Sequence, residues 1–353
     1  MTRAAIVILN YNGRNYLKKF LPSVVKYTSG HPVYVIDNDS TDDSVTFVKS
    51  NYPSIHLLQL SENKGFASGY NEALKQITAD IYVLVNTDIE VTSGWLEPIL
   101  QQMEDDPDIA ACQPKLLSYN NKNAFEYAGA AGGFIDFLGF PFCRGRLFQE
   151  MEEDHGQYND IVQIFWASGA CLFIRSEIFH RLGGFDIDFF AHMEEIDLCW
   201  RIQNAGYKVY YNGNSQVYHV GGGTLAKANP HKTYLNFRNG LSMFVKNEVQ
   251  GKLWWKLPLR SCFDFIAFLK FSVFDTLPDG FAVLKAHFFF WIRLSQTLKK
   301  RENAKKHWLK PPVRIAFIYN KSIVLEYFLR RKKKFKELHP QFLKIIHSGN
   351  KIQ

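Results

Sequence analysis

Cysteine is scarce and scattered in this chain. The 353 residues include five cysteines, an odd number, and no two of them form a C-x-x-C pair. This pattern argues against a disulfide framework and a structural zinc site, and it is typical of a reducing compartment. Long uncharged apolar runs are absent too, so we expect no ordinary membrane-spanning helix. The first ten residues turn polar too early for a signal peptide, and we expect a strand there.

The glycine signatures of common nucleotide-binding loops are also missing. Gly65 and Gly69 form a G-x-x-x-G spacing without the third glycine of the dinucleotide fingerprint, and no P-loop Gly-Lys-Ser/Thr follows. The acidic run from Asp37 lacks the glycine and the final glutamate of a calcium loop; Val48 stands at the glutamate position. Gly65 and Gly69 still allow a ligand to approach a helix N-terminus, which favours an anion.

Acidic residues are rare in the last third of the chain. Residues 1–240 hold 19 Lys+Arg and 27 Asp+Glu, a net charge of −8, whereas residues 241–353 hold 23 Lys+Arg and 7 Asp+Glu, a net charge of +16. The overall composition, 46% hydrophobic and 22% charged, is that of a globular protein. The split predicts an acidic catalytic body and a basic C-terminal region that meets an anionic surface.

The chain does contain alternating strand and helix patterns. Apolar runs predict buried strands at 4–9, 32–36, 55–60, 81–86 and 109–114, with helices between them. This order predicts an α/β fold of parallel strands joined by right-handed crossovers. Residues 118–163 lack periodicity, and we expect irregular connections there, with one hairpin and a mobile loop around 150–155. A strand within 164–174, a helix at 176–182, a short strand at 207–211, and a strand end with a glycine-rich turn at 217–224 are expected next.

Polar residues follow the predicted strands where ligands bind in open α/β sheets. Asn86 and Asp88 are two apart, so a strand points both side chains the same way, and together they suit a hard cation that holds a diphosphate. Asp37, at another strand end, suits hydrogen bonds from a nucleobase or ribose. The alternative for both segments is a turn in which the side chains cap backbone groups.

A cluster of acids begins another predicted helix. Glu194, Glu195 and Asp197 lie beside aromatic residues and a histidine. A carboxylate at a helix start near apolar walls has a raised proton affinity and suits a general base. Asp197 and Arg201 are four residues apart, which predicts an ion pair on one helix face. A lone histidine such as His219 is more often structural than functional.

Taken together, these segments resemble the family 2 inverting glycosyltransferases, particularly rhamnosyltransferase-like bacterial members. The matching pieces keep the family's order over residues 3–240: Val7-Ile-Leu-Asn-Tyr-Asn12, Val35-Ile-Asp-Asn-Asp-Ser-Thr-Asp42, Glu62-Asn-Lys-Gly-Phe-Ala-Ser-Gly-Tyr-Asn71, Asn86-Thr-Asp88, Gly183-Gly-Phe-Asp186 and Glu194-Glu-Ile-Asp-Leu-Cys-Trp-Arg201. The resemblance implies a GT-A type fold, an α/β nucleotide-binding sheet with helices on both faces, followed by a mainly α-helical basic region. The implied domains are a glycosyltransferase domain at 1–240 (nucleotide-sugar half 1–115, acceptor and catalytic half 116–240) and a helical region at 241–353.

The resemblance also implies a nucleotide-sugar site. Its members are polar or glycine residues of the matching pieces: Asn10, Asp37, Asn38, Asn63, Gly65, Asn71, Asn86 and Asp88. Asp88 with Asn86 corresponds to the metal-binding D-x-D motif, and His219 looks like a later histidine that joins the metal shell. The implied cofactor is a divalent cation, Mn²⁺ or Mg²⁺.

The same resemblance implies the catalytic residues. Asp186 would face the donor or acceptor sugar, and Glu195 stands where the family usually has the catalytic aspartate of a Glu-Asp pair. Two departures matter. Asn86 replaces the first aspartate, which weakens the cation site, and Glu195 is longer than aspartate by one methylene, so either Glu194 or Glu195 is the base. An inverting transfer needs one such base and positive charge on the departing diphosphate.

The last third of the chain is basic and aromatic. Leu253–Pro258, Cys262–Phe274 and Phe281–Leu294 combine Phe and Trp with lysines, and a polybasic segment follows at 330–336. Such segments suit helices lying in a membrane interface beside an anionic leaflet. The alternatives are a helical bundle packed on the body and a solvated basic face. No nucleic-acid-binding module is present.

The sequence therefore predicts a cytoplasmic glycosyltransferase, peripheral at the inner face of the cell membrane. It would move a sugar, with rhamnose from dTDP-rhamnose as the candidate, from a nucleoside diphosphate to a cell-surface glycan or lipid-linked acceptor. Its partners would be the donor, the acceptor and an anionic membrane surface, and not nucleic acid. Two rivals are an inactive nucleotide-sugar-binding scaffold and a sugar-nucleotide pyrophosphorylase, which would want a basic glycine-rich loop after the first strand.

Overall fold

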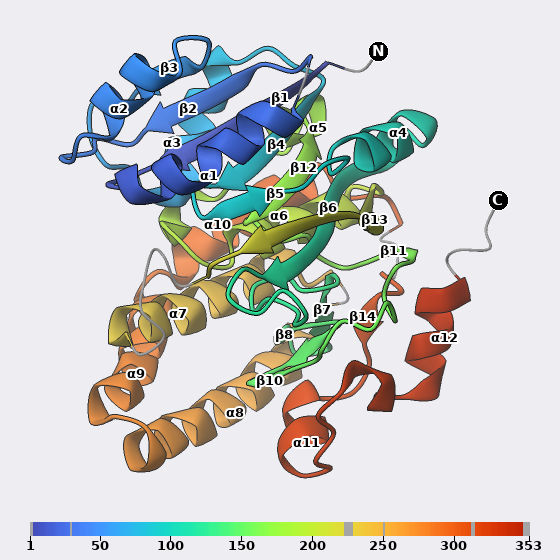
Figure 1. Cartoon of the computed structure of the whole chain (residues 1–353). Coiled ribbons are helices and arrows are strands. Elements are labelled where there is room, and N and C mark those ends of the chain that lie inside the picture. Colours follow the sequence, from blue (N-terminus) through green and yellow to red (C-terminus); the bar gives the residue numbers. More distant parts are fainter. Residues whose placement is uncertain (1–2, 29, 222–228, 250, 312–314, 349–353) are drawn as a thin grey trace.

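The computed structural model describes residues 3–28, 30–221, 229–249, 251–311 and 315–348 (Figure 1). The end of the turn predicted at 217–224 lies outside these residues. The first half of the main sheet is parallel, as the sequence predicts. β1 (Ala4–Asn10) pairs with β2 (Val33–Asp37) on one side and β4 (Ile81–Asn86) on the other, and β2 pairs with β3 (His56–Gln59).

The second half of this sheet is mixed. β12 (Cys171–Arg175) runs antiparallel between β4 and β6 (Ile109–Ser118), and β13 (Lys208–His219) runs parallel to β6. β11 (Ile161–Gln163) and β5 (Ile89–Val91) pair antiparallel with β13. The predicted short strand at 207–211 and the predicted strand end that starts at 217 belong to one long strand, β13, which has a register shift between them.

Helices cover both faces of the main sheet, as predicted. α1 (Arg14–Tyr27), α2 (Ser44–Asn51) and α4 (Glu97–Asp105) pack on one face, together with Ile6 and Ile8 of β1. α3 (Gly65–Ala73), followed by η1 (Leu74–Gln76), packs on the other face with α5 (Ser176–Arg181), α6 (Glu194–Asn204) and Val7 of β1. Successive residues of a strand point to opposite faces, so an uninterrupted apolar strand fills two cores.

Within the segment 118–163, residues 133–151 contribute four strands to a second sheet, which corrects the expectation of irregular connections there. β7 (Gly133–Asp136), β8 (Pro141–Cys143), β9 (Arg146–Leu147) and β10 (Glu150–Met151) pair in succession, and β14 (Ile318–Tyr319) adds to β7. Strands of two to four residues are too short to show a period, and β14 comes from far along the chain. In the expected loop at 150–155, Glu152 is buried and accepts hydrogen bonds from Tyr158 and the Phe335 amide.

The C-terminal region is mainly helical, as predicted. It contains α7 (Pro230–Asn247), α8 (Leu253–Phe274), α9 (Leu277–Ile292), α10 (Leu294–Lys305), α11 (Ile323–Phe328), η3 (Phe335–Glu337) and α12 (Pro340–Ser348). α7 packs against α9 and α10, and α8 packs against α9 at the end of the molecule opposite β3 (Figure 1). The predicted boundary after residue 240 falls inside α7.

Candidate active site

Polar residues gather where the parallel strands β1, β2 and β4 end. The register pairs Asn10 with Asp37 and Leu9 with Asn86, so these three strand ends lie side by side. The Asn10 Nδ2 atom donates to Asp37 Oδ1 over 3.1 Å, and both residues are buried. Asn10 Oδ1 is buried without a hydrogen-bond partner in the described structure. Burying an unsatisfied polar atom is unfavourable, so this edge of the sheet suits a polar ligand.

The second polar group joins β2 to the start of α3. Asn38 Nδ2 donates to Asn63 Oδ1 over 3.0 Å and to the Gly65 carbonyl over 3.2 Å. Gly65 has a φ of 69°, and a Cβ atom there would lie 2.6 Å from the Phe190 ring. Glycine is therefore required for the α3 N-terminus to sit against this ring. The structure brings Asn10, Asp37, Asn38, Asn63 and Gly65 together, as the resemblance implied.

Asp88 and His219 meet just beyond these strand ends. Asp88 Oδ1 lies 3.1 Å from His219 Nε2, and His219 Nδ1 lies 3.2 Å from Glu126 Oε2. All three side chains are buried. Burial alone would lower the pKa of His219, but the carboxylates of Glu126 and Asp88 outweigh it and raise the pKa to about 10. Burial opposes ionisation of Asp88, yet the contact with His219 lowers its pKa.

Asp88 and His219 are residue types that bind divalent cations, and a cation would have to displace the proton that lies between His219 Nε2 and Asp88. Within the described ranges no group of three or more His, Cys, Asp or Glu side chains is arranged as a metal site. Asp88 and His219 nevertheless present an oxygen and a nitrogen as neighbours, and Glu126 fixes the other imidazole nitrogen, as in carboxylate–histidine–metal arrangements. A cation held here would take its other ligands from phosphate oxygens or water, as Mg²⁺ commonly does.

The segment before α6 has an unusual backbone. Phe190, His192 and Met193 have φ values of 61°, 70° and 72°, which non-glycine residues rarely adopt. Such strain clusters at functional sites. The Phe190 carbonyl accepts the Phe66 amide over 2.9 Å, which ties the segment to the start of α3.

Glu194 and Glu195 open α6 with unsatisfied carboxylate oxygens. The Oε2 atom of each is buried and has no hydrogen-bond partner in the described structure. Burial raises the pKa of Glu195 to about 7. Burial and then the neighbouring charge of Glu195 raise the pKa of Glu194 well above its usual range. Two adjacent carboxyl groups with different proton affinities are the arrangement that acid–base catalysis uses.

Glu195 lies close to the end of β4. A Cβ atom on Gly169 would lie 3.7 Å from Glu195 Cβ, and the next residue, Ala170, accepts the Asn86 amide over 3.0 Å. On the other side, Ser168 donates to the Ala128 carbonyl, and the Ala128 amide donates to Glu126. The catalytic candidates at 194–195 and the Asp88–His219–Glu126 cluster therefore surround the same short segment at 168–170.

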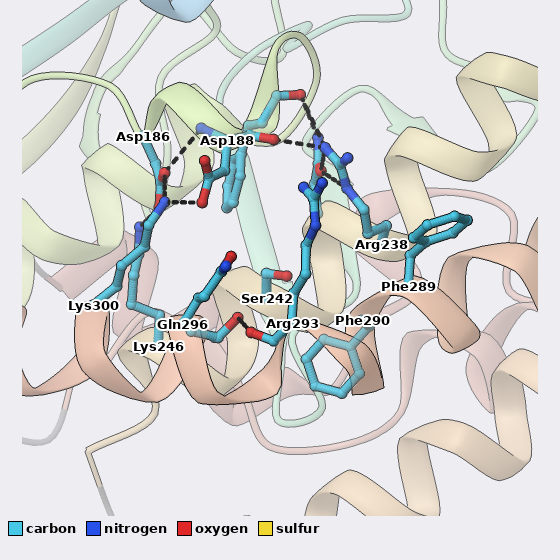
Figure 2. Close-up of a pocket in the computed structure, with 13 residues that line it drawn as sticks. Asp186, Asp188, Arg238, Ser242, Lys246, Phe289, Phe290, Arg293, Gln296 and Lys300 are labelled. Carbon is cyan, nitrogen blue, oxygen red and sulfur yellow. Dashed lines mark hydrogen bonds and ion pairs between the residues drawn. The ribbon is translucent and has the colours of Figure 1, made fainter.

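Asp186 lies in a network of ion pairs (Figure 2). Its carboxylate contacts Lys246 of α7, 2.6 Å away, and Lys300 of α10. Burial opposes its ionisation, but these two lysines hold the pKa of Asp186 well below its usual range. Lys246 also contacts Asp197, which pairs with Arg201 over 2.9 Å as predicted. Asp186 therefore attaches the loop before α6 to α7 and α10, and its carboxylate is committed to lysines.

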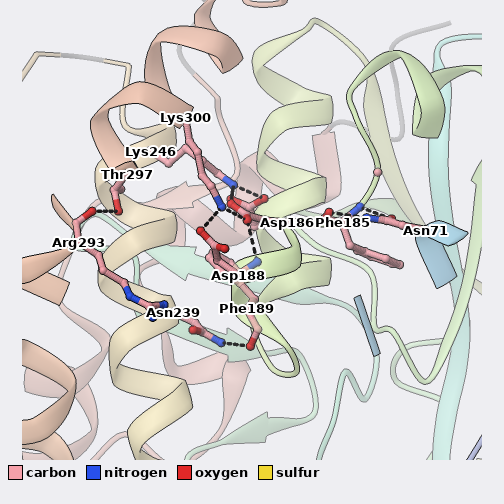
Figure 3. A network of polar contacts seen from close by, with 12 residues as sticks. Asn71, Phe185, Asp186, Asp188, Phe189, Asn239, Lys246, Arg293, Thr297 and Lys300 are labelled. Carbon is pink, nitrogen blue, oxygen red and sulfur yellow. Dashed lines mark hydrogen bonds and ion pairs between the residues drawn. The ribbon is translucent and has the colours of Figure 1, made fainter. Parts of the chain in front are cut away.

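Asn71 supports the same loop. Figure 3 shows its side chain against the Phe185 backbone, where Asn71 Oδ1 accepts the amide over 2.9 Å and Nδ2 donates to the carbonyl over 2.8 Å. This contact places Asn71 beside the loop that leads to Asp186.

Two residues of the site were not among the predicted set. Glu126 lies in the aperiodic segment 118–163, where no sequence signal marks it. His192 has a buried Nε2 atom without a described hydrogen-bond partner, and burial, followed by the charges of Lys232 and His231, lowers its pKa to about 4. Its position two residues before the Glu194–Glu195 pair was the available signal.

The mixed sheet, the helices on both faces and the polar strand-end site define a GT-A type glycosyltransferase. The chain belongs to glycosyl transferase family 2, whose model matches residues 5–183. It is 25% identical over 275 residues to the N-acetylglucosaminyl-diphospho-decaprenol L-rhamnosyltransferase of Mycobacterium tuberculosis, an alignment covering 72% of this chain and 87% of that protein. The rhamnosyltransferase-like resemblance and the glycosyltransferase prediction are thus confirmed.

Solved structures support the same fold. The GalNAc-T7 structure with UDP, GalNAc and Mn²⁺ has a TM-score of 0.54 at 16% identity, covering 69% of this chain and 47% of that one. The structure of S. aureus TarS 1–349 has a TM-score of 0.53 at 15% identity, covering 80% of this chain and 78% of that one.

Proposed function

We propose that this glycosyltransferase moves a sugar from a nucleoside diphosphate to a lipid-linked or glycan acceptor with inversion, using Glu195 as the base. The observation that carries the proposal is the pair of unsatisfied carboxylates at the start of α6, beside segment 168–170, whose Ala170 carbonyl accepts the amide of Asn86 at the end of β4. Inversion in one displacement requires a single base that removes the proton from the acceptor hydroxyl.

Proton affinity distinguishes the two glutamates. With a pKa of about 7, Glu195 loses its proton within the neutral range and accepts one from a hydroxyl group. Burial and the neighbouring charge of Glu195 raise the pKa of Glu194 well above its usual range, which favours its protonated form. Protonated Glu194 is a hydrogen-bond donor beside the base, and it limits the negative charge in the pocket. This difference in proton affinity supports Glu195 as the base in our proposal.

Asp88 and His219 would hold a divalent cation, with Glu126 fixing the imidazole. Such a cation supplies Lewis-acid stabilisation of the departing diphosphate. A metal is also part of the GalNAc-T7 structure, which contains Mn²⁺. Asn86 is neutral, so the negative charge at the site comes from Asp88 and, through His219, from Glu126.

The strand-end residues would bind the nucleoside part of the donor. Asp37 and Asn38 lie at the end of β2, with Asn10 and Asn63 in hydrogen-bond contact with them. For the sugar we propose rhamnose from dTDP-rhamnose, because the M. tuberculosis relative is named as an L-rhamnosyltransferase. The name of that relative also motivates a diphosphate-linked lipid as the acceptor.

We further propose a position at the cytoplasmic face of the membrane. Within the described residues no helix is both long and apolar enough to span a bilayer. α8 and α9 expose large apolar side chains, including Phe265, Val273, Phe274, Phe281 and Phe288, with Phe274 79% exposed. Exposed lysines accompany them at positions 252 and 285. An apolar patch of this kind marks an interaction surface, and basic residues favour anionic lipid.

Product formation from a panel of nucleoside diphosphate sugars and a lipid-linked acceptor tests the proposal. We expect transfer by the wild-type protein, loss of transfer in Glu195→Gln, and normal transfer in Glu177→Gln, whose side chain lies exposed on α5. Full activity of Glu195→Gln would refute the assignment of the base. A product with retained anomeric configuration would refute inversion.

A further inference from the structure

Two hollows lie in line between α7 and the α9–α10 helices. The first has a volume of about 720 Å³ and is lined mainly by apolar side chains, among them Tyr234, Phe281 and Phe288. The second is narrow, with a free volume of about 20 Å³, and is lined by charged residues that include Arg238 and Arg293. Tyr234 of the first hollow and Phe289 of the second are in ring contact, with centroids 6.1 Å apart. The two hollows are therefore neighbours with this ring pair between them, and together they are here called the α7–α9 groove, with an apolar end and a basic end.

The basic end has more positively charged side chains than carboxylates. Its two carboxylates, Asp186 and Asp188, are matched by Lys300, and Asp186 also by Lys246. The two guanidinium groups remain without a carboxylate partner in the described structure. Arg238 donates to the Asp188 carbonyl over 2.8 Å and to Asn239. The Arg293 side chain has no described partner at all and is exposed.

The two arginines approach the same space. Figure 2 shows their side chains rising from α7 and from the α9–α10 junction toward the backbone at 188–189. Two guanidinium groups in one pocket repel each other unless an anion lies between them. Guanidinium donors match phosphate oxygens in geometry, so a diphosphate is the anion that best suits such a pair. Among the described residues, the exposed Arg293 side chain has no hydrogen-bond or ion-pair partner, so it can adjust its position.

The apolar end faces a different environment. Phe281 and Phe288 line it and are more than half exposed, so this hollow opens onto the apolar surface of α8 and α9. A hydrocarbon chain entering from a membrane interface would meet this end first. The groove is thus arranged for one amphiphile, with a chain at the α9 side and two phosphates at the arginine side.

The basic end is also tied to the catalytic segment. Asn239, which follows Arg238, donates to the carbonyls of Phe189, Ala191 and His192 over 3.0, 3.0 and 2.8 Å. These residues form the strained segment that leads into Glu194 and Glu195. An anion bound to Arg238 would therefore lie next to the loop that leads to Glu195.

We propose that the α7–α9 groove binds the carrier end of a lipid-linked acceptor, a single hydrocarbon chain joined to a diphosphate. The diphosphate lies on Arg238 and Arg293, and the first part of the chain lies against Tyr234, Phe281 and Phe288. This inference rests on the proposed function, because it gives the sugar attached to that diphosphate access to Glu195. A bulk phospholipid suits the groove less well, since it has two chains and one phosphate.

Calorimetric binding of farnesyl diphosphate to the full-length protein tests this site. We expect tighter binding than for inorganic diphosphate or farnesol, and at least about tenfold weaker binding in Arg293→Gln, which loses charge-assisted hydrogen bonds. Phe288→Ser should weaken the binding of farnesyl diphosphate but not the binding of inorganic diphosphate. Lys299→Gln removes an exposed charge from α10 and should leave binding unchanged. Arg293 makes no described structural contact, so its variant is expected to keep the fold.

Three results would overturn the inference. One is that the wild type and Arg293→Gln bind farnesyl diphosphate with equal affinity. Another is equal affinity for farnesyl diphosphate and inorganic diphosphate, and the third is complete displacement by phosphatidylglycerol vesicles, which would indicate a general headgroup site. Binding of nucleotide sugars, measured by thermal shift, distinguishes failure of the groove proposal from failure of the proposed function. If farnesyl diphosphate binding depends on Arg293 but no nucleotide sugar binds, the site stands and the proposed function fails.

Discussion

Asp88 and His219 are separated by 131 residues in sequence, yet Asp88 Oδ1 and His219 Nε2 lie 3.1 Å apart. The contact forms because β4 ends at Asn86 and the Asp88 carbonyl then accepts the amide of Val220, the residue after β13. Glu126 completes the arrangement from the other side of the imidazole. This triad gives the polar edge of the sheet its candidate cation site.

Glu126 should control metal affinity without touching the metal. Replacing it by glutamine removes the charge that orients His219, and losing such a partner commonly weakens metal binding by about 10- to 100-fold. Calorimetric titration with Mn²⁺ in the presence of nucleoside diphosphate measures the change. Glu90→Gln, which alters a carboxylate paired with exposed Lys122, is the control and should bind Mn²⁺ normally. Unchanged affinity in Glu126→Gln would show that Glu126 does not position His219.

The pH dependence of transfer should report Glu195. Its pKa of about 7 means that kcat/KM rises with pH through the neutral range as the base loses its proton. Glu195→Gln should lose about 10²- to 10⁴-fold in rate and lack this inflection. Glu194→Gln should retain far more activity, because glutamine resembles the protonated carboxyl group. Initial rates between pH 5 and 9 should be measured for the wild type and for both variants. An unaltered inflection in Glu195→Gln would assign the titration to another group.

Glu195 should lower the free energy of unfolding as the pH rises. Its folded-state pKa of about 7 lies above the ordinary value of 4.5, so the folded state holds the proton more tightly than the unfolded state. Stability is therefore full below the ordinary pKa and falls as pH rises toward 7. The unfolding free energy of Glu195→Gln, measured relative to that of the wild type, should be higher at pH 8 than at pH 5 by roughly 1–3 kcal/mol. Urea unfolding at both pH values measures this, and a difference independent of pH would contradict it.

Lys246 should be a major determinant of stability. Its buried ammonium group contacts Asp186 and Asp197, and removing one member of a buried ion network leaves charge poorly compensated. Because Lys300 and Arg201 remain, we expect Lys246→Met to lose about 2–4 kcal/mol of unfolding free energy. Lys305→Met, which breaks an exposed pair with Glu302, should change stability by less than about 1 kcal/mol. Equal effects of the two substitutions in denaturant titrations would argue against a structural role for the Asp186 network.

Membrane binding should depend on α8 and α9. The double variant Phe274→Glu with Phe281→Glu places charge on the exposed apolar face and should strongly reduce co-sedimentation with anionic vesicles. Val25→Glu changes an exposed apolar residue on α1 and should sediment as wild type does. Binding should also weaken at high salt, because lysines contribute. Vesicle binding that the double variant leaves intact would place the membrane contact elsewhere.

The parallel half of the sheet could be predicted from sequence because its signals are local. Apolar runs such as 81–86 end in Asn and Asp, and the carboxyl ends of parallel strands share an edge. That rule places Asn10, Asp37 and Asn86 together before any coordinates are known. The antiparallel insertion of β12 between β4 and β6 follows from long-range pairing, which no short window encodes.

Other parts of the site could not be predicted for related reasons. Glu126 follows no motif, and its role depends on a histidine 93 positions later in the numbering. Asp186 carries a family signature, but its lysine partners come from α7 and α10, whose packing the sequence does not reveal. The strands β7 to β10 of the small second sheet have two to four residues each, too few to show a period, and β14 joins them from far along the chain.

The most direct test of the account is a crystal structure with Mn²⁺ and a nucleoside diphosphate sugar. The account predicts an anomalous manganese peak in contact with Asp88 and His219, the nucleoside against Asp37 and Asn38, and the sugar facing Glu195. A manganese peak away from this pair, or a sugar bound out of reach of Glu195, would contradict the claim that these distant acids serve one reaction.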